Sequence, residues 1–236
     1  MHVFQLPEPF VEPTERRVRV RLGPTVVADS RRAMLLTEFG RDVLPTYFLP
    51  LDDVRPGVLV DENGGRWSVA ADGRRAADAA YTDDRFDELK GHVSFSWETL
   101  DWYEEDEQVF CHARPPYNRV DTLRSSRRVE VFIDGERVAH STRPLLLFET
   151  YLPTRYYLPF SDVRMDLLTP SDTVTRCPYK GVARYWSHPA LPDAAWSYPD
   201  PIPENPKIKD LICFYDERVD VVVDGQPQQR PVTPFS

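Results

Sequence analysis

The feature that most constrains the fold of this chain is an internal repeat with a period of about 110 residues. Residues 16–39 and 127–150 are identical at eleven of 24 positions, and both segments begin with Arg-Arg-Val. After a two-residue change in spacing, YFLPLDDVR (47–55) matches YYLPFSDVR (156–164) at six of nine positions. Solenoid units are 20–50 residues long, so a period of this size indicates the tandem duplication of a whole domain.

Later anchors extend the alignment of the two copies. Trp67-Ser68 matches Trp186-Ser187, and the stretch WETLDWYEED (97–106) falls opposite DERVDVVVDG (216–225). We therefore predict four segments, which are an extended N-terminal arm (1–15), a first, degenerate repeat (16–110), a linker (111–126) and a second repeat (127–236).

Short strands dominate the pattern within each copy. RRVRVRL (16–22) alternates apolar and charged residues with the period of two that is typical of a half-buried strand. Asp134-Gly135 between two apolar runs is a strong hairpin signal. The chain has 23 prolines, which are tolerated poorly inside helices, and only residues 82–91 and 206–211 have a helical composition. The sequence predicts an all-β protein with little helix.

Composition excludes several classes of function. The net charge is −9, whereas nucleic-acid binders present a basic face, so we expect no nucleic-acid partner. The three cysteines form no CxxC pair and the five histidines form no metal-binding motif, so we expect no metal and no cofactor. No apolar run approaches the length of a membrane span, and the N-terminus does not resemble a signal peptide. We expect a cytoplasmic protein with reduced thiols and no membrane association.

The densest chemistry lies in TVTRCPYKGVARYWS (173–187), which the first copy lacks. Pro178 and Gly181 predict a β-turn that holds Cys177 and Lys180 close together. Nearby cations stabilise a thiolate, so Cys177 is a candidate nucleophile, while a buried structural thiol is the alternative. Lys180 is a candidate anion ligand or nucleophile, and a solvated hairpin lysine is its alternative. Neither GxxxxGK[ST] nor GxGxxG occurs in the chain.

Aromatic and charged residues gather around this stretch. Tyrosine and tryptophan rings build both hydrophobic cores and the walls of ligand pockets, and both interpretations remain open. Because buried charges require partners, we also predict structural ion pairs that recur in the two copies. Their members are Arg143, Glu149 and Asp162 in the second copy and Arg32, Glu38, Asp53 and Arg55 in the first.

The run from LLLFETYLP (145–153) to CPYKGVARYWS (177–187), with AAWSYPDP (194–201) and the closing RPVTPFS (230–236), resembles a bacterial family known as domain of unknown function 427. That family is also filed under a nucleotidyltransferase-like label, and its tandem form is similar to this chain over nearly its full length. The resemblance implies a β-tent fold, in which two small antiparallel sheets meet at a steep angle. Relatives of that shape hold zinc with two CxxC pairs, which are absent here. Others bind flat small molecules in an aromatic cage, which by analogy implies a pocket lined by Trp186, Trp196 and Tyr198.

Our leading hypothesis is that the second copy binds an unknown small molecule. Its predicted pocket has walls of Tyr156, Tyr185, Trp186 and Trp196, with Cys177 and Lys180 at the mouth. The full predicted binding set is Tyr156, Arg164, Cys177, Tyr179, Lys180, Tyr185, Trp186, Trp196 and Tyr198. The alternatives are a nucleotidyltransferase-like or thiol-dependent enzyme that uses Lys180 or Cys177, and a purely structural or interaction protein.

Overall fold

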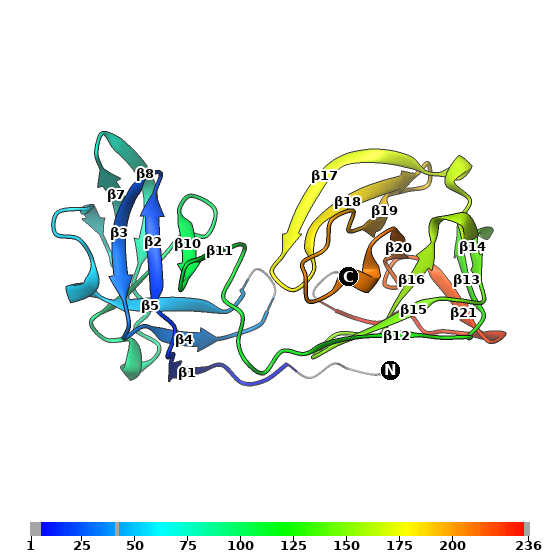
Figure 1. The fold of residues 1–236 in the computed structure, drawn as a ribbon, viewed down its shortest axis with the longest axis horizontal. Coiled ribbons are helices and arrows are strands. Elements are labelled where there is room, and N and C mark those ends of the chain that lie inside the picture. The colour runs from blue at the N-terminus through cyan, green and yellow to red at the C-terminus, as the bar shows by residue number, and fades with distance from the viewer. Residues whose placement is uncertain (1–5, 41–42, 234–236) are drawn as a thin grey trace. The chain divides into compact units, whose positions relative to one another are not determined.

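The structure is a computed structural model that describes residues 6–40 and 43–233. The chain divides into two compact units, the first spanning residues 7–115 and the second beginning at Pro116. In the described residues both units consist of antiparallel strands and short 3₁₀ turns, with no α-helix (Figure 1). The protein is therefore all-β, as the sequence predicts.

The first unit contains two antiparallel sheets. One sheet has seven strands, in the spatial order β1 (Phe10–Pro13), β4 (Met34–Thr37), β5 (Thr46–Pro50), β9 (His92–Phe95), β8 (Arg74–Tyr81), β7 (Arg66–Ala71) and β6 (Leu59–Asn63). The other sheet has four strands, in the order β11 (Glu107–Val109), β10 (Asp101–Glu104), β2 (Val18–Leu22) and β3 (Thr25–Ser30).

The second unit repeats this arrangement. Its seven-stranded sheet has the order β12 (Val120–Arg124), β15 (Leu145–Glu149), β16 (Arg155–Pro159), β20 (Leu211–Phe214), β19 (Leu191–Ser197), β18 (Gly181–His188) and β17 (Thr169–Cys177). Its four-stranded sheet has the order β14 (Glu136–Ser141), β13 (Val129–Ile133), β21 (Asp220–Val223) and β22 (Gln226–Pro227). Strand for strand, the two units share one topology, which is the structural counterpart of the sequence repeat.

Two predicted segments differ from the structure. In the predicted N-terminal arm, residues 10–13 form β1 and pair with β4. In the predicted linker, residues 120–124 form β12 and pair with β15, and the division between the units falls after Pro115. Both are short edge strands without clear apolar alternation, so the pattern that reveals the other strands is missing. Each repeat therefore begins one strand earlier than the sequence indicates.

Burial follows the predicted alternation. In β2 the side chains of Val18 and Val20 are fully buried, and Arg19 and Arg21, which alternate with them, are half-buried. The Asp134-Gly135 hairpin joins β13 and β14, and both turn residues have the positive φ that this turn requires (50° and 77°). The two stretches of helical composition contain only single turns. The 3₁₀ turns span Leu51–Asp53 and Asp87–Leu89 in the first unit, and Phe160–Asp162, Met165–Leu167 and Pro206–Ile208 in the second.

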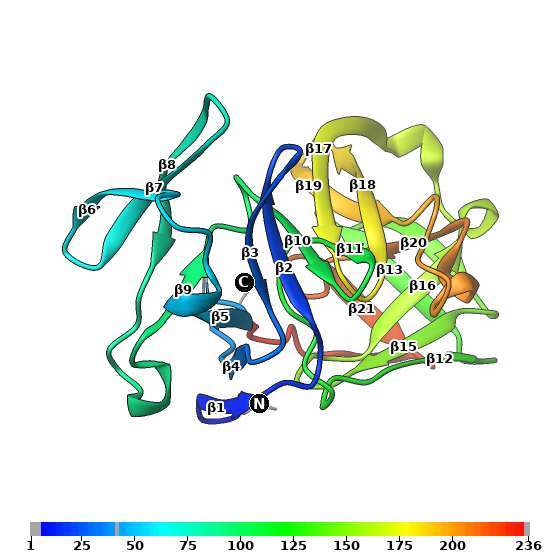
Figure 2. The same cartoon turned by 60° about the vertical axis from the view of Figure 1, so that its left-hand side comes forward.

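The seven-stranded sheet of the second unit is apolar on both faces. One face packs against the four-stranded sheet through Leu158, Ile212 and Phe214, together with valines of β13 and β21. The opposite face carries a separate cluster that includes Tyr157 and Trp196. Figures 1 and 2 show that this sheet is strongly curved at β17, β18 and β19.

The crossing between the sheets, where the chain passes from the small sheet to the large sheet, is fixed in the same way in both units. Asp162 accepts hydrogen bonds from the Ser141 hydroxyl at 2.8 Å and from the Arg143 guanidinium at 3.0 Å. Asp53 accepts the equivalent bonds from Ser30 and Arg32 in the first unit. The Arg143 guanidinium, helped by the hydroxyls of Ser141 and Ser161, lowers the pKa of Asp162 to about 2 despite its partial burial.

The other residues predicted to form ion pairs have different partners. Glu38 pairs with Arg85 at 2.8 Å, and Arg55 lies 3.6 Å from Asp72. Glu149 pairs with Lys180, which was predicted as a site residue rather than as a structural cation.

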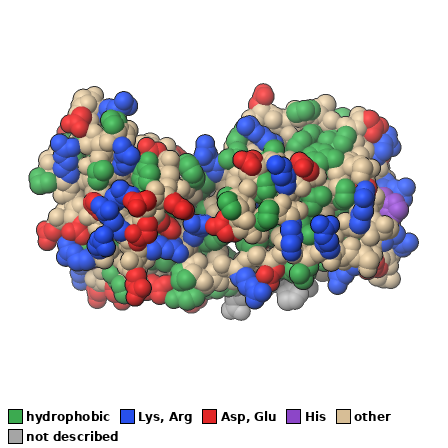
Figure 3. Space-filling view, viewed as in Figure 1, with side chains coloured by type: hydrophobic (Ala, Val, Ile, Leu, Met, Phe, Trp, Pro, Cys, Tyr) green, Lys and Arg blue, Asp and Glu red, His purple; other side chains and the backbone are tan. Residues whose placement is uncertain are grey.

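The surface mixes both signs of charge. On the face shown in Figure 3, acidic and basic side chains are interspersed over both units. In the described part of the chain, no helix combines the length and apolar character needed to cross a membrane.

Candidate ligand-binding cavity

The CPYKG segment forms the predicted turn between β17 and β18. The Lys180 amide donates to the Cys177 carbonyl at 3.3 Å, which closes the turn. Gly181 follows with a φ of 110°, and a Cβ atom there would lie 3.1 Å from the Asp200 carbonyl oxygen. Both observations require glycine at this position. The turn is therefore held tightly against the segment that follows β19.

This turn directs Lys180 inward. Its ammonium group forms an ion pair with the Glu149 carboxylate, and their side chains are 10% and 8% exposed. Burial disfavours the charged amine, but the neighbouring Cys177 and Glu149 outweigh it and raise the pKa of Lys180 above its ordinary value. Lys180 is thus a paired, protonated cation, whereas a nucleophilic amine must be neutral.

Cys177 lies at the edge of the same cluster, half-buried against its aromatic side chains. Burial raises the pKa of the Cys177 thiol, although the charge of Lys180 acts in the opposite direction. The shift is opposite to the one that activates a nucleophilic cysteine. The surroundings of Cys177 therefore favour its structural alternative. Lys180 is not the solvated hairpin lysine of its own alternative, because it is buried in an ion pair with Glu149.

The four rings predicted to wall one pocket do not lie together. Tyr185 and Trp196 belong to the cluster on the outer face of the large sheet, whereas Tyr156 and Trp186 pack on the opposite face. Tyr185 and Trp186 are consecutive in β18, and consecutive side chains of a strand point to opposite faces. The prediction of one pocket behind all four rings is corrected accordingly.

The outer cluster is closed and internally bonded. The Trp196 indole donates to the Tyr157 hydroxyl at 3.2 Å, and the Tyr185 hydroxyl lies 2.8 Å from the Thr175 hydroxyl. Tyr198 is 4% exposed in the same cluster. These rings form a packed core, which is the other interpretation left open by the sequence.

Two further predicted residues lie elsewhere. The Tyr179 carbonyl accepts a hydrogen bond from the buried Asn205 amide at 2.7 Å, which fixes the turn. Arg164 pairs with Asp166 at 2.5 Å and lines a hollow of about 290 Å³ beside His140. Neither residue lies at the aromatic cluster.

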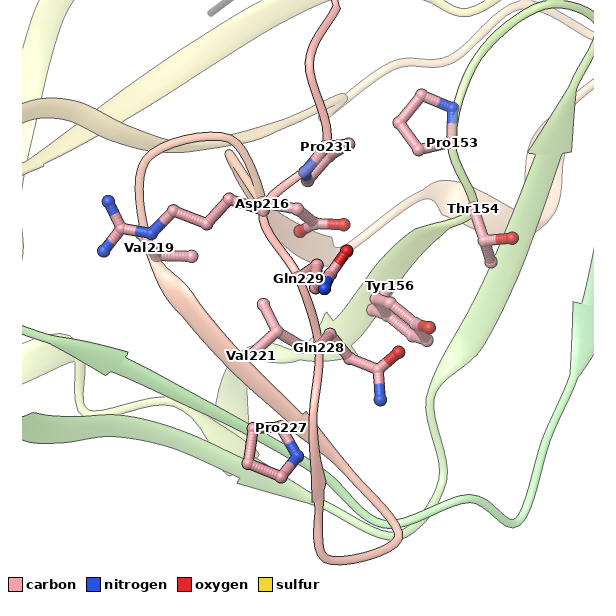
Figure 4. A pocket seen from close by; sticks show the side chains of 11 residues that line it. Pro153, Thr154, Tyr156, Asp216, Val219, Val221, Pro227, Gln228, Gln229 and Pro231 are labelled. Carbon is pink, nitrogen blue, oxygen red and sulfur yellow. The ribbon is translucent and has the colours of Figure 1, made fainter. Parts of the chain in front are cut away.

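A larger cavity, of about 470 Å³, lies on the inner side of the second unit. It is half open to solvent and is bordered by Pro153, Thr154 and Tyr156 on one side, by Val219 and Val221 on another, and by residues 227–231. Figure 4 shows Asp216, Gln229 and Tyr156 close together across it, with Pro153 and Thr154 to one side. Of the predicted binding residues, only Tyr156 is among those that line it.

A buried ion pair supports the polar end of this cavity. Arg155 and Glu217 form a bidentate pair at 2.8 and 2.6 Å, and their side chains are 6% and 0% exposed. The Asp216 carboxylate lies 3.9 Å from the same guanidinium, and its residue is 9% exposed. Burial raises the pKa of Asp216 to about 7, against the opposing charge of Arg155 and with a further contribution from Glu217.

The first unit fills the equivalent space. Trp97 and Trp102 stand opposite Asp216 and Val221 in the alignment of the repeats. Their rings stack with centroids 4.4 Å apart and planes within 12°. Trp102 is 1% exposed and also packs against Tyr47, the counterpart of Tyr156. Two indoles thus occupy the position where the second unit has a carboxylate, an isopropyl group and a cavity.

Sequence reasoning missed Arg155, Asp216 and Glu217. The alignment of 97–106 with 216–225 carried the signal, because it replaces two tryptophans with small side chains at once. Loss of so much volume at two neighbouring core positions predicts a cavity unless other residues grow to fill it.

In residues 6–40 and 43–233, no group of three His, Cys, Asp or Glu side chains converges on a point where an ion could bind.

The chain matches a known family of domains. The sequence model of a family described as a domain of unknown function (DUF427) matches residues 10–106 and again residues 121–225. The two matched regions begin near β1 and β12 and end just before β11 and β22, so each covers one unit of the fold except its last short strand. No curated protein matches the chain.

Proposed function

The chain belongs to the DUF427 domain family, in tandem form, and we propose that its second unit is a small-molecule binding module. The binding site is the cavity lined by Tyr156 and Asp216. One observation carries the proposal, which is that the second unit keeps this space open while its twin fills the same space with Trp97 and Trp102.

The size and lining of the cavity suit a small ligand. A volume of about 470 Å³ falls within the usual range of ligand sites. Such sites combine apolar walls with a few convergent polar groups, and here Val219, Val221 and prolines meet the Asp216 carboxyl and two glutamine amides. The Tyr156 ring supplies a face for stacking.

An unfilled space beside a core reduces stability, because the buried side chains that border it, Val219 and Val221, have fewer packing partners than in a filled site. The Arg155–Glu217 pair behind it adds the desolvation of two charges. Strained and underpacked features of this kind concentrate at functional sites, where they are retained for the sake of function. The second unit has both features at one place.

The test fills the cavity with the twin's own side chain. In Val221→Trp the indole should occupy the cavity and abolish the binding of any fragment that ligand-observed NMR detects on the wild-type protein. Val222→Tyr is the matched control, because it places the aligned first-unit residue, Tyr103, on the opposite face of the same strand. Its binding should remain within about twofold of wild type.

Folding of Val221→Trp is checked by hydrogen exchange, and Asp216→Trp/Val221→Trp, which imports both indoles, is the second filling variant. Fragments that bind the filled variants as tightly as wild type would place binding outside this cavity. A diverse fragment library with no ligand for the wild-type cavity would equally count against the proposal.

A further inference from the structure

We infer that the ligand of this cavity presents a cationic nitrogen, such as an amidine or an amine on a flat apolar ring, to the carboxylate of Asp216. The inference rests on the proposed binding function and adds the chemical class of the ligand. The ring would pack against Tyr156, and the nitrogen would donate its hydrogen bonds to the carboxylate oxygens.

Charge balance inside the site supports a cation. Arg155 is the guanidinium behind the cavity, and its short hydrogen bonds both go to Glu217. The Asp216 carboxylate comes no closer than 3.9 Å to the same guanidinium. One cation therefore faces two carboxyl groups, and a buried carboxylate without full compensation is unfavourable. A ligand cation would supply the missing charge.

The other charged groups around the cavity do not fill this role. Arg230, which lines the cavity, is bonded to Asp220 at 2.8 and 3.1 Å. The charge of Arg127 lowers the pKa of the Tyr156 hydroxyl, and the charge of Asp224 raises it. Arg230 is thus engaged with Asp220 and Arg127 with the Tyr156 hydroxyl, while Arg155 is the cation that acts on Asp216.

The geometry also suits a flat ring that carries its charge at one end. Asp216 is nine-tenths buried at the polar end, with the Tyr156 ring, Gln229 and Thr154 around the space in front of it (Figure 4). Amidinium groups match a carboxylate with two parallel hydrogen bonds, as guanidinium groups do. Tyrosine faces attract cations as well as rings.

Protonation of Asp216 predicts that the affinity for a cationic ligand depends on pH. Burial raises the pKa of Asp216 to about 7, under the influence of Arg155 on β16 and of the adjacent Glu217. Tyr156 on β16 and Cys213 on β20 face the same carboxyl, and burial raises the pKa of both groups. A cation binds the ionised form better, so affinity should rise with pH until Asp216 is fully ionised.

The experiment compares three probes of one shape and different charge, which are benzamidine, benzamide and benzoate. Affinities are measured by NMR titration of the full-length protein. At pH 8 benzamidine should bind at least tenfold more tightly than benzamide, and benzoate should bind most weakly, as expected for a charge-assisted hydrogen bond in a buried site. Benzamidine affinity should fall at least tenfold between pH 8 and pH 5.

Asp216→Asn keeps the shape of the side chain and removes its charge. It should weaken benzamidine binding about tenfold or more, leave benzamide binding nearly unchanged, and abolish the pH dependence. Benzamide or benzoate binding as tightly as benzamidine would overturn the ligand class but leave the proposed binding function intact. Benzamidine binding that survives in Val221→Trp would mean that the cavity is not the site, which overturns both. Failure of all three probes at millimolar concentration would also overturn the ligand class.

Discussion

The two units of this protein share a topology and differ in what fills the space between their sheets. Both have a seven-stranded and a four-stranded antiparallel sheet in the same strand order. The aspartate, serine and arginine that lock the crossing between the sheets recur at matching positions. In the first unit Trp97 stacks on Trp102, whereas in the second unit Asp216 and Val221 border a cavity.

The difference separates the requirements of the fold from those of a site. Because strand order and crossing are unchanged, neither depends on how this space is filled. A packed indole pair stabilises a domain, whereas a cavity beside a buried ion pair does not. The first unit therefore represents the arrangement expected from stability alone, and the second unit departs from it at the residues to which we assign binding.

The largest effect should come from breaking the buried ion pair of the second unit. Arg155→Met leaves the carboxylate of Glu217, whose side chain is 0% exposed, without its bidentate partner. We expect a loss of about 3–5 kcal/mol in the free energy of unfolding of the second unit. Hydrogen exchange read peptide by peptide separates the two units and provides the measurement.

The matched control uses the counterpart of Glu217 in the first unit. Glu98 is exposed, so Glu98→Gln should change stability by less than about 0.5 kcal/mol. The double variant Arg155→Met/Glu217→Gln should recover most of the loss, because it removes both charges together. If Arg155→Met costs no more than Glu98→Gln, the ion pair does not distinguish the two units energetically.

The second-largest effect is expected in the first unit, where the two indoles pack together. Trp102→Val gives the first unit the residue that the second unit has at this position, and it removes an indole that is 1% exposed. We expect the first unit to lose about 3 kcal/mol, from lost burial together with a new cavity. Val221→Ala, which enlarges a cavity that already exists, should cost the second unit about 1–2 kcal/mol. Equal losses in the two units, again measured by hydrogen exchange, would contradict the packing difference.

Much of the fold could be predicted from the sequence. The repeat, the all-β class and the Asp134-Gly135 hairpin all follow from local signals that the structure retains. The edge strands β1 and β12 were missed because edge strands lack the apolar alternation that marks a half-buried strand. Local pattern thus identifies the body of each sheet better than its margins.

The candidate site could be predicted only in part. The aromatic residues near CPYKG were identified from the sequence. Which face of the sheet each ring lies on depends on whether its position in the strand is odd or even. Consecutive residues such as Tyr185 and Trp186 point to opposite faces, but this follows only once both are known to lie in one strand. Asp216 was overlooked because a single aspartate after an apolar run is ordinary. Its meaning comes from Trp97 at the matching place in the other copy.

A third effect depends on pH and is smaller than the first two over any single pH unit. The folded protein holds the Asp216 proton up to about pH 7, whereas the unfolded chain releases it near 3.8. Between these values the folded state binds more protons, so the free energy of unfolding of the second unit should fall as pH rises, by up to about 1.4 kcal/mol per pH unit. Asp216→Asn should remove this slope and be more stable than wild type at pH 8. The first unit, with Trp97 at this position, is the internal control, and an equal slope in both units would contradict the assignment.

The smallest difference is expected where the two units are most alike. Asp162 and Asp53 each join a serine hydroxyl to an arginine at the crossing between the sheets. Asp162→Asn and Asp53→Asn should therefore each cost their own unit about 1 kcal/mol, typical of a partly exposed charged hydrogen bond, and the two losses should agree within about 0.5 kcal/mol. The pKa of both carboxyls is lowered by these partners, so the stabilisation is present above about pH 4 and is lost as pH falls through the folded-state pKa. The free energies of unfolding of both variants, measured at pH 7 and pH 3, test whether this shared aspartate stabilises the two units equally. A clear difference between the two losses would show that the units differ in more than the cavity.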